Sequence, residues 1–392
     1  MTQDIFPNAH ATAPPTPHKG RGALSNTAST RFTALQREAV DDGWPASPAH
    51  AEAPGQAEQA GQAEQAETPG DTDPPESRAT VVGEDRGPGI LTRNRSPDIP
   101  FDRSINPYKG CEHGCIYCFA RPTHAYLDLS PGLDFETKLH AKPEAPAALR
   151  AALNKPGYVP DVVTLGANTD PYQPVERRLR ITRGLLEVLA EARHPVCIVT
   201  KSPGVTRDLD ILEPMARDGL VRVMVSITTL DRALARKLEP RAPTPMRRVA
   251  ALRALAEAEV PTGVLAAPMI PALNESELEA ILAEAADAGA QSAGYVLLRL
   301  PHEVKDLFAE WLDVHYPERK DHILNRVREA RGGKLNDAAW GTRFKGRGRH
   351  ADLLAQRFDL ACKRHGLNGQ RWTLDTTLFR PPARDPRQMS LF

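Results

Sequence analysis

The 392-residue sequence lacks the features that mark several classes of protein. It has no run of about 18 apolar residues, so we expect no helix that crosses a membrane. Its first residues contain no basic segment followed by an apolar stretch, so we expect no secretory signal. Only five cysteines are present. Three of them are clustered, which does not indicate a disulfide framework and favours a reducing cytoplasm.

Large apolar residues are almost absent between residues 45 and 80. This region is rich in Ala, Pro, Gln, Glu and Gly, and the unit Gly-Gln-Ala-Glu-Gln-Ala occurs twice, at 55–60 and 61–66. Such a segment buries too little surface to offset the entropy that is lost on ordering. We therefore predict a disordered N-terminal tail over residues 1–88.

Short apolar runs alternate with amphipathic ones after residue 89. The apolar runs are rich in β-branched residues, as buried parallel strands are, and lie at 104–106, 162–166, 196–200, 221–227, 262–267 and 294–298. Helical patterns lie between them, at 179–192, 207–217, 245–258 and 275–288. Six β/α units in series predict an α/β fold, with a parallel barrel or partial barrel over residues 89–300.

The pattern changes after residue 300. Predicted helices at 302–315, 318–331 and 352–365 make up a helical C-terminal extension over 301–379. Residues 319–350 hold ten Lys/Arg and three Asp/Glu, a net charge of +7 on a chain of zero formal charge. Trp340 and Phe344 lie among these cations, where aromatic rings are suited to stack on bases. This predicts a surface for DNA, and the alternative is a solvated face with both rings in the core.

Three cysteines lie within eight residues, as Cys111, Cys115 and Cys118 in the spacing C-x3-C-x2-C. They supply three thiolates, whereas a fully ligated four-iron cluster needs four ligands. A cluster held here would keep one iron open for a substrate or cosubstrate. The alternative is a zinc site with His113 or His124 as the fourth ligand.

Tyr117 directly precedes the third cysteine, and with it the loop resembles the radical S-adenosylmethionine (radical SAM) superfamily. The resemblance covers about residues 95–300 and implies a partial (β/α)6 radical SAM barrel. It implies a [4Fe-4S] cluster on the three cysteines, S-adenosylmethionine on the open iron, and a reductant such as flavodoxin or ferredoxin. Reductive cleavage of S-adenosylmethionine would give a 5′-deoxyadenosyl radical that abstracts hydrogen from a substrate.

Within the superfamily the chain is most similar to the spore photoproduct lyase-like group, which includes predicted DNA repair photolyases. Four segments carry the similarity: residues 106–111, 166–173, 199–202 and 225–228. The last three follow predicted strands, at the carboxyl ends where barrel sites lie.

This similarity implies a set of cosubstrate contacts. Thr169 and Asp170 would accept hydrogen bonds from the ammonium group of S-adenosylmethionine, and Lys201 would pair with its carboxylate. Ser226 would bond the ribose, and Ala267 would offer backbone groups to the adenine. Tyr117 is assigned to the cofactor site by its place before Cys118.

Asn168 marks a departure from the lyase, which has a hydrogen-donating cysteine at the matching position. Lyase chemistry on a thymine dimer, with a cysteine returning the hydrogen, is therefore not supported. Tyr172 or Tyr295 is the alternative redox residue, and Cys197 and Cys362 are expected to be structural.

The first hypothesis for function is a radical SAM enzyme that acts on DNA, in a repair-related reaction. The second is a radical SAM enzyme that modifies RNA, a peptide or a small metabolite. The third is a non-catalytic iron–sulfur or zinc module that binds nucleic acid.

The chain ends in a pentapeptide, Gln388, Met389, Ser390, Leu391 and Phe392, after a Pro/Arg-rich tether that begins at residue 380. It resembles the segment by which bacterial polymerases and repair proteins bind the replication sliding clamp. In such segments a Leu-Phe anchor fills an apolar pocket and Gln fixes the register. Residues 380–392 are therefore predicted to be a flexible clamp-binding tail, and the alternative is a tail that folds back on the core.

Overall fold

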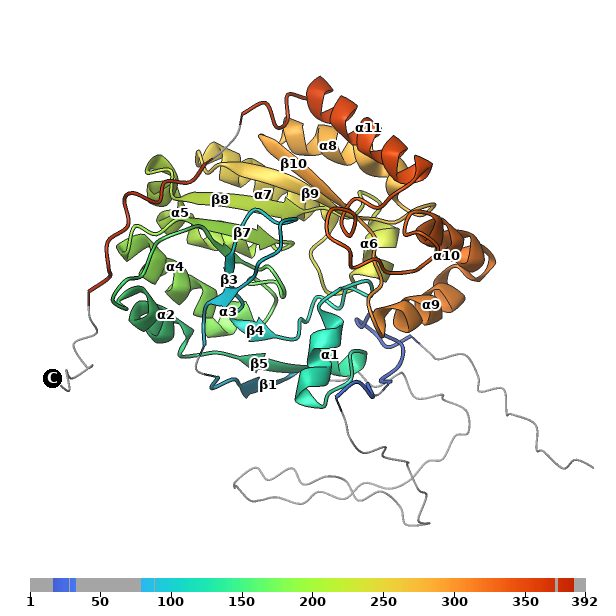
Figure 1. Ribbon diagram of the computed structural model, residues 1–392, viewed down its shortest axis with the longest axis horizontal. Helices are drawn as coiled ribbons and strands as arrows, with labels where there is room; N and C mark the ends of the chain where they lie inside the picture. The colour runs from blue at the N-terminus through green and yellow to red at the C-terminus, as the bar shows by residue number, and fades with distance from the viewer. Residues whose placement is uncertain (1–16, 28, 33–78, 88, 371–372, 384–392) are drawn as a thin grey trace, which may run out of the picture.

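The computed structural model describes residues 17–27, 29–32, 79–87, 89–370 and 373–383. The main feature is a seven-stranded sheet in the order β10-β9-β8-β7-β6-β3-β2 (Figure 1). Its strands are β2 Thr92–Arg93, β3 Arg103–Ile105, β6 Val163–Leu165, β7 Val196–Thr200, β8 Val221–Ser226, β9 Thr262–Met269 and β10 Ser292–Leu297. Only β2 is antiparallel to its neighbour in this sheet.

The six parallel strands follow one another in chain order, which confirms the predicted partial (β/α)6 barrel. The connecting helices are α2 Ala145–Leu153, α3 Glu176–Leu179, α4 Ile181–Glu191, α5 Leu209–Arg217, α6 Arg232–Leu238, α7 Pro245–Glu257 and α8 Leu278–Asp287. In Figure 1 the helices α2, α4, α5, α7 and α8 lie on the outer face of the curved sheet. Within the described residues, no helix is both long enough and apolar enough to span a bilayer.

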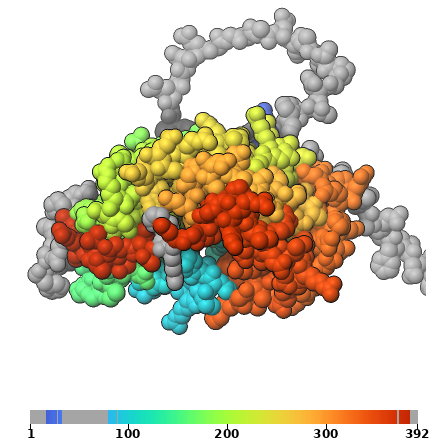
Figure 2. Space-filling view, turned by 90° about the horizontal axis from the view of Figure 1, so that it is seen from above, coloured from blue at the N-terminus to red at the C-terminus, as the bar shows by residue number. Residues whose placement is uncertain are grey.

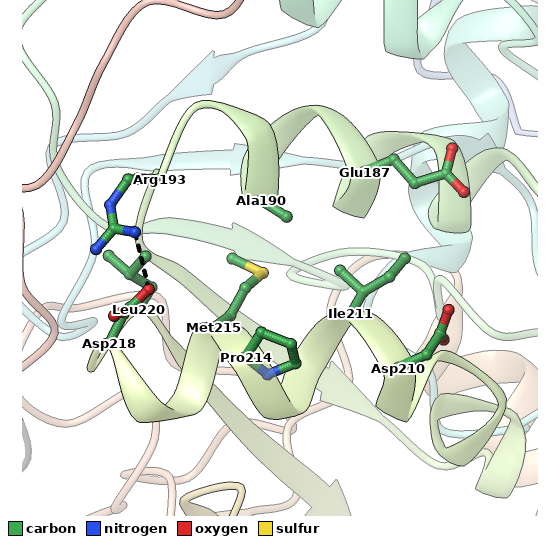
Figure 3. Close-up of a pocket in the computed structure, with 9 residues that line it drawn as sticks. All are labelled: Glu187, Ala190, Arg193, Asp210, Ile211, Pro214, Met215, Asp218 and Leu220. Carbon is green, nitrogen blue, oxygen red and sulfur yellow. Dashed lines mark ion pairs between the residues drawn. The ribbon is translucent and has the colours of Figure 1, made fainter.

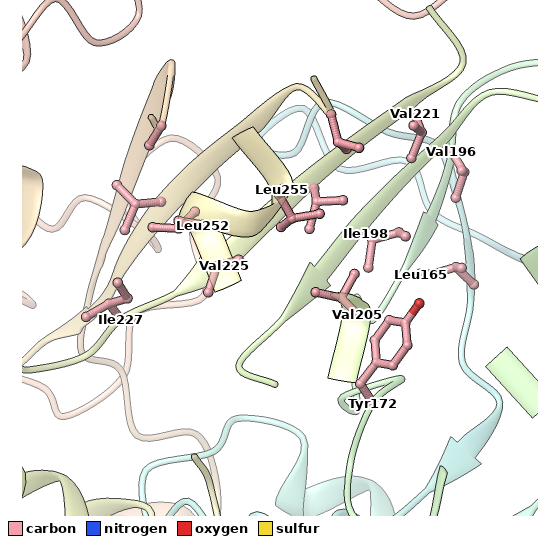
Figure 4. Close-up of a cluster of buried hydrophobic side chains, with 14 of the residues drawn as sticks. Leu165, Tyr172, Val196, Ile198, Val205, Val221, Val225, Ile227, Leu252 and Leu255 are labelled. Atoms are coloured by element: carbon pink, nitrogen blue, oxygen red, sulfur yellow. The ribbon is translucent and has the colours of Figure 1, made fainter. Parts of the chain in front are cut away.

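The core lies between this sheet and its outer helices. Leu165, Ile198 and Val225 are fully buried strand residues, and Leu252 and Leu255 of α7 pack over the sheet (Figure 4). Burial of β-branched and leucine side chains on both faces of these short strands accounts for their near-continuous apolar sequence.

A second, three-stranded sheet has the order β1-β5-β4, from strands β1 Val81–Glu84, β4 Tyr108–Lys109 and β5 Lys138–Ala141. The cysteine loop follows β4, and the 3-10 helix η1 (Arg121–Leu127) and helix α1 (Leu133–Thr137) lie between that loop and β5. The small sheet therefore brackets the cysteine loop at both of its ends.

Residues 17–27 fall within the predicted disordered tail, but they pack against α1 and the cysteine loop, and we call them the N-terminal strap. Ala23 is fully buried, and the amides of Gly22 and Ala23 donate to the two carboxylate oxygens of Glu136 at 2.9 and 2.8 Å. Figure 1 shows this blue segment beside α1 and α9 (Val304–His315). The prediction of disorder over residues 1–88 is therefore wrong for the strap and for β1. Most of the predicted tail lies outside the described residues.

The helical C-terminal extension is confirmed as α9, α10 (Lys320–Glu329) and α11 (Arg349–Arg364). Helix α11 packs against α8 and continues the outer helical layer (Figure 1). Between α10 and α11, the basic loop of residues 332–348 lies against the end of β10, and the Leu297 amide donates to the Phe344 carbonyl at 2.8 Å. Arg343 of this loop pairs with Asp98 at 2.7 Å, and Figure 2 shows the cyan residues near 100 against the orange-red extension.

Candidate active site at the cysteine loop

The three clustered cysteines lie together in the loop after β4. None of the three forms a disulfide bond, and the Cys111 and Cys115 side chains are buried. Burial raises the pKa of each of the three thiols, and the charges of Cys115 and Cys118 raise the pKa of Cys111 further. Cys118 packs against the buried clusters that hold Cys111 and Cys115, so the three side chains share one neighbourhood.

This donor set fits a four-iron cluster. Among the described residues, no group of three His, Cys, Asp or Glu side chains is arranged to hold a single metal ion. A cluster binds each cysteine through a different iron, so its three thiolates need not converge on one point. Cys111, Cys115 and Cys118 would hold such a cluster, which supplies the electron for reductive chemistry when bound.

Arg121 fixes the backbone of the cysteine loop. Its side chain is fully buried, and all five guanidinium N–H groups have acceptors. They donate to the carbonyl oxygens of Cys115 (2.9 Å), Gly114 (3.1 Å), Pro131 (3.0 Å) and Gly132 (3.0 Å), and to a Glu136 carboxylate oxygen at 2.5 Å. Because Glu136 also binds the strap amides, one ion pair joins the cysteine loop, α1 and the strap.

Gln173 fixes the other end of the loop. Its amide oxygen accepts from the Glu112 N–H at 2.9 Å, and its amide nitrogen donates to the Gly110 carbonyl at 3.2 Å. The two bonds flank Cys111, whose own N–H donates to the Phe135 carbonyl at 2.9 Å. Gly110 adopts φ +77°, and a Cβ there would lie 2.9 Å from the Phe135 carbonyl oxygen, so only glycine fits.

A buried polar hub, formed by Thr228, Glu239 and Arg248, lies beside the cysteines. The Tyr117 hydroxyl donates to the Glu239 carboxylate and lies 3.1 Å from the Thr228 hydroxyl. Lys201 Nζ lies 3.2 Å from Glu239 Oε1 and 5.8 Å from the centre of the Tyr117 ring. The hub therefore brings together two residues that the sequence analysis assigned to the cofactor site, Tyr117 and Lys201.

The hub also reaches the ends of two more strands. Arg248 donates to the Ser226 carbonyl at 3.2 Å, and the Thr228 hydroxyl lies 2.9 Å from the Ala267 carbonyl. Burial opposes the charge on Glu239, but Arg248 and Lys201 hold its pKa well below the usual range. Glu239 therefore carries a charge that two cations compensate inside the protein.

Thr169 and Asp170 lie at the carboxyl end of β6 and are bound by protein groups. The Thr169 hydroxyl donates to the Tyr108 carbonyl at 2.7 Å. Asp170 accepts from the Thr200 hydroxyl (2.7 Å), the Lys201 amide (2.7 Å) and the Tyr172 amide (2.9 Å), and lies 3.4 Å from His113 Nδ1. Binding of a cosubstrate ammonium group by these two residues stays a prediction, and Asp170 clearly positions the ends of β6 and β7.

The residues weighed as hydrogen donors lie in different surroundings. The Asn168 amide donates to the Asn106 side chain at 3.0 Å, next to β3. The Tyr172 hydroxyl donates to Asp208 at 3.0 Å among the core side chains of Figure 4. The Tyr295 ring packs against Phe358 of α11 at a tilt of 48°, with ring centres 4.8 Å apart. Cys197 is buried in β7 and Cys362 in α11, as expected of structural cysteines.

A cleft of about 410 Å³ lies between α4 and α5, away from the cysteine loop (Figure 3). Met215 and Pro214 form its apolar floor, and the Arg193–Asp218 ion pair closes one end at 3.0 Å. The cleft lies in the outer helical layer, and none of the predicted site residues lines it.

Sequence reasoning gave no role to five of the residues that organise the site: Arg121, Gln173, Thr228, Glu239 and Arg248. Most of them act through contacts between residues far apart in the chain, which leave no local pattern. A weak signal was available for Gln173 and Thr228, because they end the segments 166–173 and 225–228 that carried the family resemblance.

Comparisons with known proteins agree with this geometry. Residues 105–285 match the family profile of the Radical SAM superfamily. An uncharacterized protein of Mycobacterium tuberculosis (strain ATCC 25618 / H37Rv) is 38% identical over 233 residues, which make up 59% of this chain and 67% of the relative. An uncharacterized protein of Methanocaldococcus jannaschii is 25% identical over 223 residues, 57% of this chain and 80% of the relative.

Solved structures of spore photoproduct lyase share the fold. The lyase complexed with dinucleoside spore photoproduct has a TM-score of 0.52 at 19% identity, covering 74% of this chain and 80% of the lyase chain. A mutant with bound AdoMet and the same dinucleoside has a TM-score of 0.52 at 18% identity, with the same coverage. The chain belongs to the radical SAM superfamily, whose members use a [4Fe-4S] cluster and S-adenosylmethionine.

Proposed function

We propose that this radical SAM enzyme acts on nucleic acid, with DNA as the substrate and a repair-related reaction as its role. The observation that carries the proposal is the basic loop of residues 332–348, which is held at the carboxyl end of the last barrel strand. In barrels, the carboxyl ends of the strands are where active sites lie.

Arg331 is the residue that holds this loop. It is buried and donates to the carbonyls of Leu298 (3.1 Å), Thr342 (3.0 Å) and Arg343 (2.8 Å), and also to that of Leu297. Burial and the nearby charge of Arg299 lower the pKa of Arg331 to about 10, against the opposing charge of Asp337. A rigid attachment of this kind suits a loop that must present charges at a fixed place.

The loop and the start of α11 expose several cations. Lys334, Lys345 and Arg349 are exposed, and none of them has an ion-pair partner among the described residues. The Trp340 side chain is 65% exposed beside them, where it is available to stack on a base. Unpaired cations next to an exposed aromatic ring are typical of surfaces that bind phosphates and bases.

The fold shared with spore photoproduct lyase supports a DNA substrate, since that enzyme is recorded in complex with a dinucleoside photoproduct. Asn168 in place of the donor cysteine indicates that the hydrogen returned to the substrate has another source. The proposed reaction therefore shares the radical initiation of the lyase and differs in its later steps.

In this proposal Cys111, Cys115 and Cys118 hold the cluster, and Tyr117 packs beside it. Lys201 binds the carboxylate of S-adenosylmethionine, and Thr169 and Asp170 receive its ammonium group. Ser226 and Ala267 contact the ribose and adenine, at the ends of β8 and β9. A flavodoxin or ferredoxin in a reducing cytoplasm would supply the electron.

Two measurements test the proposal. Anaerobically reconstituted protein should cleave S-adenosylmethionine to 5′-deoxyadenosine under dithionite, and protein with Cys115→Ala should not. The same protein should bind duplex or single-stranded DNA with an affinity that falls steeply with salt. If the protein binds no DNA even at low salt, the DNA substrate is rejected and the radical SAM assignment remains intact.

We also propose that the C-terminal pentapeptide binds the bacterial sliding clamp. Residues 388–392 lie outside the described residues, but the chain before them is anchored. The Arg380 amide donates to the Ala192 carbonyl at 2.9 Å, and the Ala383 amide donates to Glu191 at 2.8 Å. Nine further residues can reach about 30 Å beyond this anchor.

Fluorescence anisotropy with a labelled 380–392 peptide and purified bacterial clamp tests this partner. Saturable binding that is lost on Leu391→Ala and Phe392→Ala is the expected result. Binding that is unchanged by both substitutions would reject the clamp as the partner.

A further inference from the structure

Arg299 follows β10 at the carboxyl edge of the sheet and lies between the cysteine loop and the basic loop. Its guanidinium carbon lies 4.9 Å from the ring centre of Phe119 and 5.5 Å from that of Phe344. Phe119 directly follows Cys118, and Phe344 belongs to the basic loop. Arg299 therefore links the cluster end of the molecule to its cationic surface.

The charge of Arg299 is not compensated by a carboxylate. No hydrogen bond or ion pair joins its guanidinium to any residue that the structure describes, although that group has five N–H donors. Burial and the nearby charge of Arg343 lower the pKa of Arg299. Other half-buried arginines differ in this respect: Arg343 has Asp98 at 2.7 Å and Arg357 has Glu279 at 2.7 Å.

The half-buried guanidinium has no acceptor among the described residues, and its nitrogen atoms are still reached by solvent, so its N–H groups are available to an anionic ligand. Phe119 and Phe344 hold the guanidinium by cation–π contacts, and its planar fork of N–H groups suits two oxygens of one phosphate. The Phe119 side chain is 44% exposed, so its outer face is free for a base.

We propose that Arg299 binds a backbone phosphate of the nucleic-acid strand that enters the active site, with the adjacent base stacked on Phe119. This assignment rests on the proposed function and names the contact nearest the cluster. It requires a polynucleotide, because a phosphate at Arg299 and further phosphates at Lys345 and Arg349 belong to one strand.

The test uses the full-length, anaerobically reconstituted protein and a fluorescein-labelled single-stranded DNA 12-mer over a range of salt concentrations. Arg299→Gln should weaken binding by at least about tenfold and lower the slope of log K against log salt by about 0.7. Arg299→Lys should recover part of the affinity, because it keeps the charge but loses the paired N–H groups. Arg253→Gln, on the exposed face of α7, is the matched control and should change neither quantity.

Two further readouts distinguish a strand-phosphate contact from a role at the cluster and from a mononucleotide site. The reduction potential of the cluster should be the same in Arg299→Gln and the parent. A shifted potential with unchanged DNA affinity would overturn the proposal and assign Arg299 to the cluster. Competition by inorganic phosphate or thymidine monophosphate as strong as that by the unlabelled 12-mer would also overturn it, since a mononucleotide would then satisfy the site.

The outcome is distinguishable from failure of the proposed function. If Lys345→Ala with Arg349→Ala weakens DNA binding and Arg299→Gln does not, the basic loop binds DNA and the Arg299 assignment is wrong. If the parent protein binds no DNA, the proposed function itself is rejected, and the assignment that rests on it is rejected as well.

Discussion

The polar hub and the basic loop are both rich in charge, but they hold it in opposite ways. Glu239 and Arg248 of the hub are buried, and Lys201 beside the hub is half-buried. Each of the three has an ion-pair partner within the protein. Lys334, Lys345 and Arg349 are exposed and have no carboxylate partner in the described part of the chain. The hub thus compensates its charges within the protein, whereas the exposed charges of the basic loop remain available to the nucleic acid that we propose as its partner.

The largest effect in this comparison is expected at the cysteines. Cys115→Ala should abolish both iron binding and cleavage of S-adenosylmethionine, because only three thiols are available to hold the cluster. Iron content, visible absorbance and 5′-deoxyadenosine formation measure this. Cys362→Ala is the control, and it should retain all three properties; equal losses in both variants would contradict a cluster at the loop.

The hub should depend on the charge of Glu239. Glu239→Gln leaves Arg248 and Lys201 buried without their carboxylate, so the free energy of unfolding should fall by about 3–5 kcal/mol. Urea denaturation of the iron-free protein measures this loss without interference from the cluster. Glu257→Gln, on the exposed face of α7, should cost less than about 0.5 kcal/mol. A similar stability for the two variants would show that the hub is not an energetic unit.

The cysteine loop should depend on Arg121 in a similar way. Arg121→Lys keeps the charge next to Glu136 but removes most of the hydrogen bonds to four carbonyls, at an expected cost of about 2–3 kcal/mol. Urea denaturation measures the cost, and the rate of iron loss to a chelator shows whether the loop opens. A variant with parent-like stability and iron retention would mean that the loop is fixed by other contacts.

A substitution in the strap tests whether close packing of the strap on the cysteine loop keeps the site closed. A Cβ on Gly22 would lie 1.8 Å from the Gly114 carbonyl oxygen, so Gly22→Ala must displace the strap, at a cost of about 1–3 kcal/mol. Faster proteolysis within residues 17–27 and faster iron loss to a chelator are the expected signs. Gly89→Ala is the matched control, since a Cβ there meets nothing within 4 Å.

The smallest effect on the fold is expected at the basic loop. Lys345→Ala with Arg349→Ala should leave the free energy of unfolding within about 0.5 kcal/mol of the parent. The slope of log K for DNA against log salt should fall by about one for each phosphate contact that is lost. A changed free energy of unfolding with an unchanged salt slope would mean that these cations stabilise the fold, as the hub does, and do not bind DNA.

Sequence reasoning succeeded where one local pattern decided the structure. The strand at 196–200 was predicted to the residue, because five apolar or β-branched positions follow one another, four of them buried and Val199 half-buried. Helix α4 begins later than predicted, at Ile181, because Arg180 adopts φ +52° and separates it from the short helix α3. The cysteine loop was found from its spacing alone.

The remainder could not be predicted, because it depends on contacts between distant residues. The small sheet uses strands of two to four residues, too short for a periodic signal. Glu239 receives its partners from β7, α7 and the cysteine loop, which only the folded chain brings together. The strap buries few apolar side chains and is held by hydrogen bonds, so its composition resembles that of an unstructured segment.

The contacts of the N-terminal strap impose an order on biosynthesis. Ser25 of the strap donates to Glu310, 285 residues later in the chain, at 2.7 Å, whereas the Gly22 amide donates to Glu136, 114 residues later, at 2.9 Å. The strap can therefore contact α1 and the cysteine loop as soon as residue 136 has been made, but it can contact α9 only after residue 310. Its final position is thus reached in two steps, first at the cysteine loop and then at the C-terminal extension.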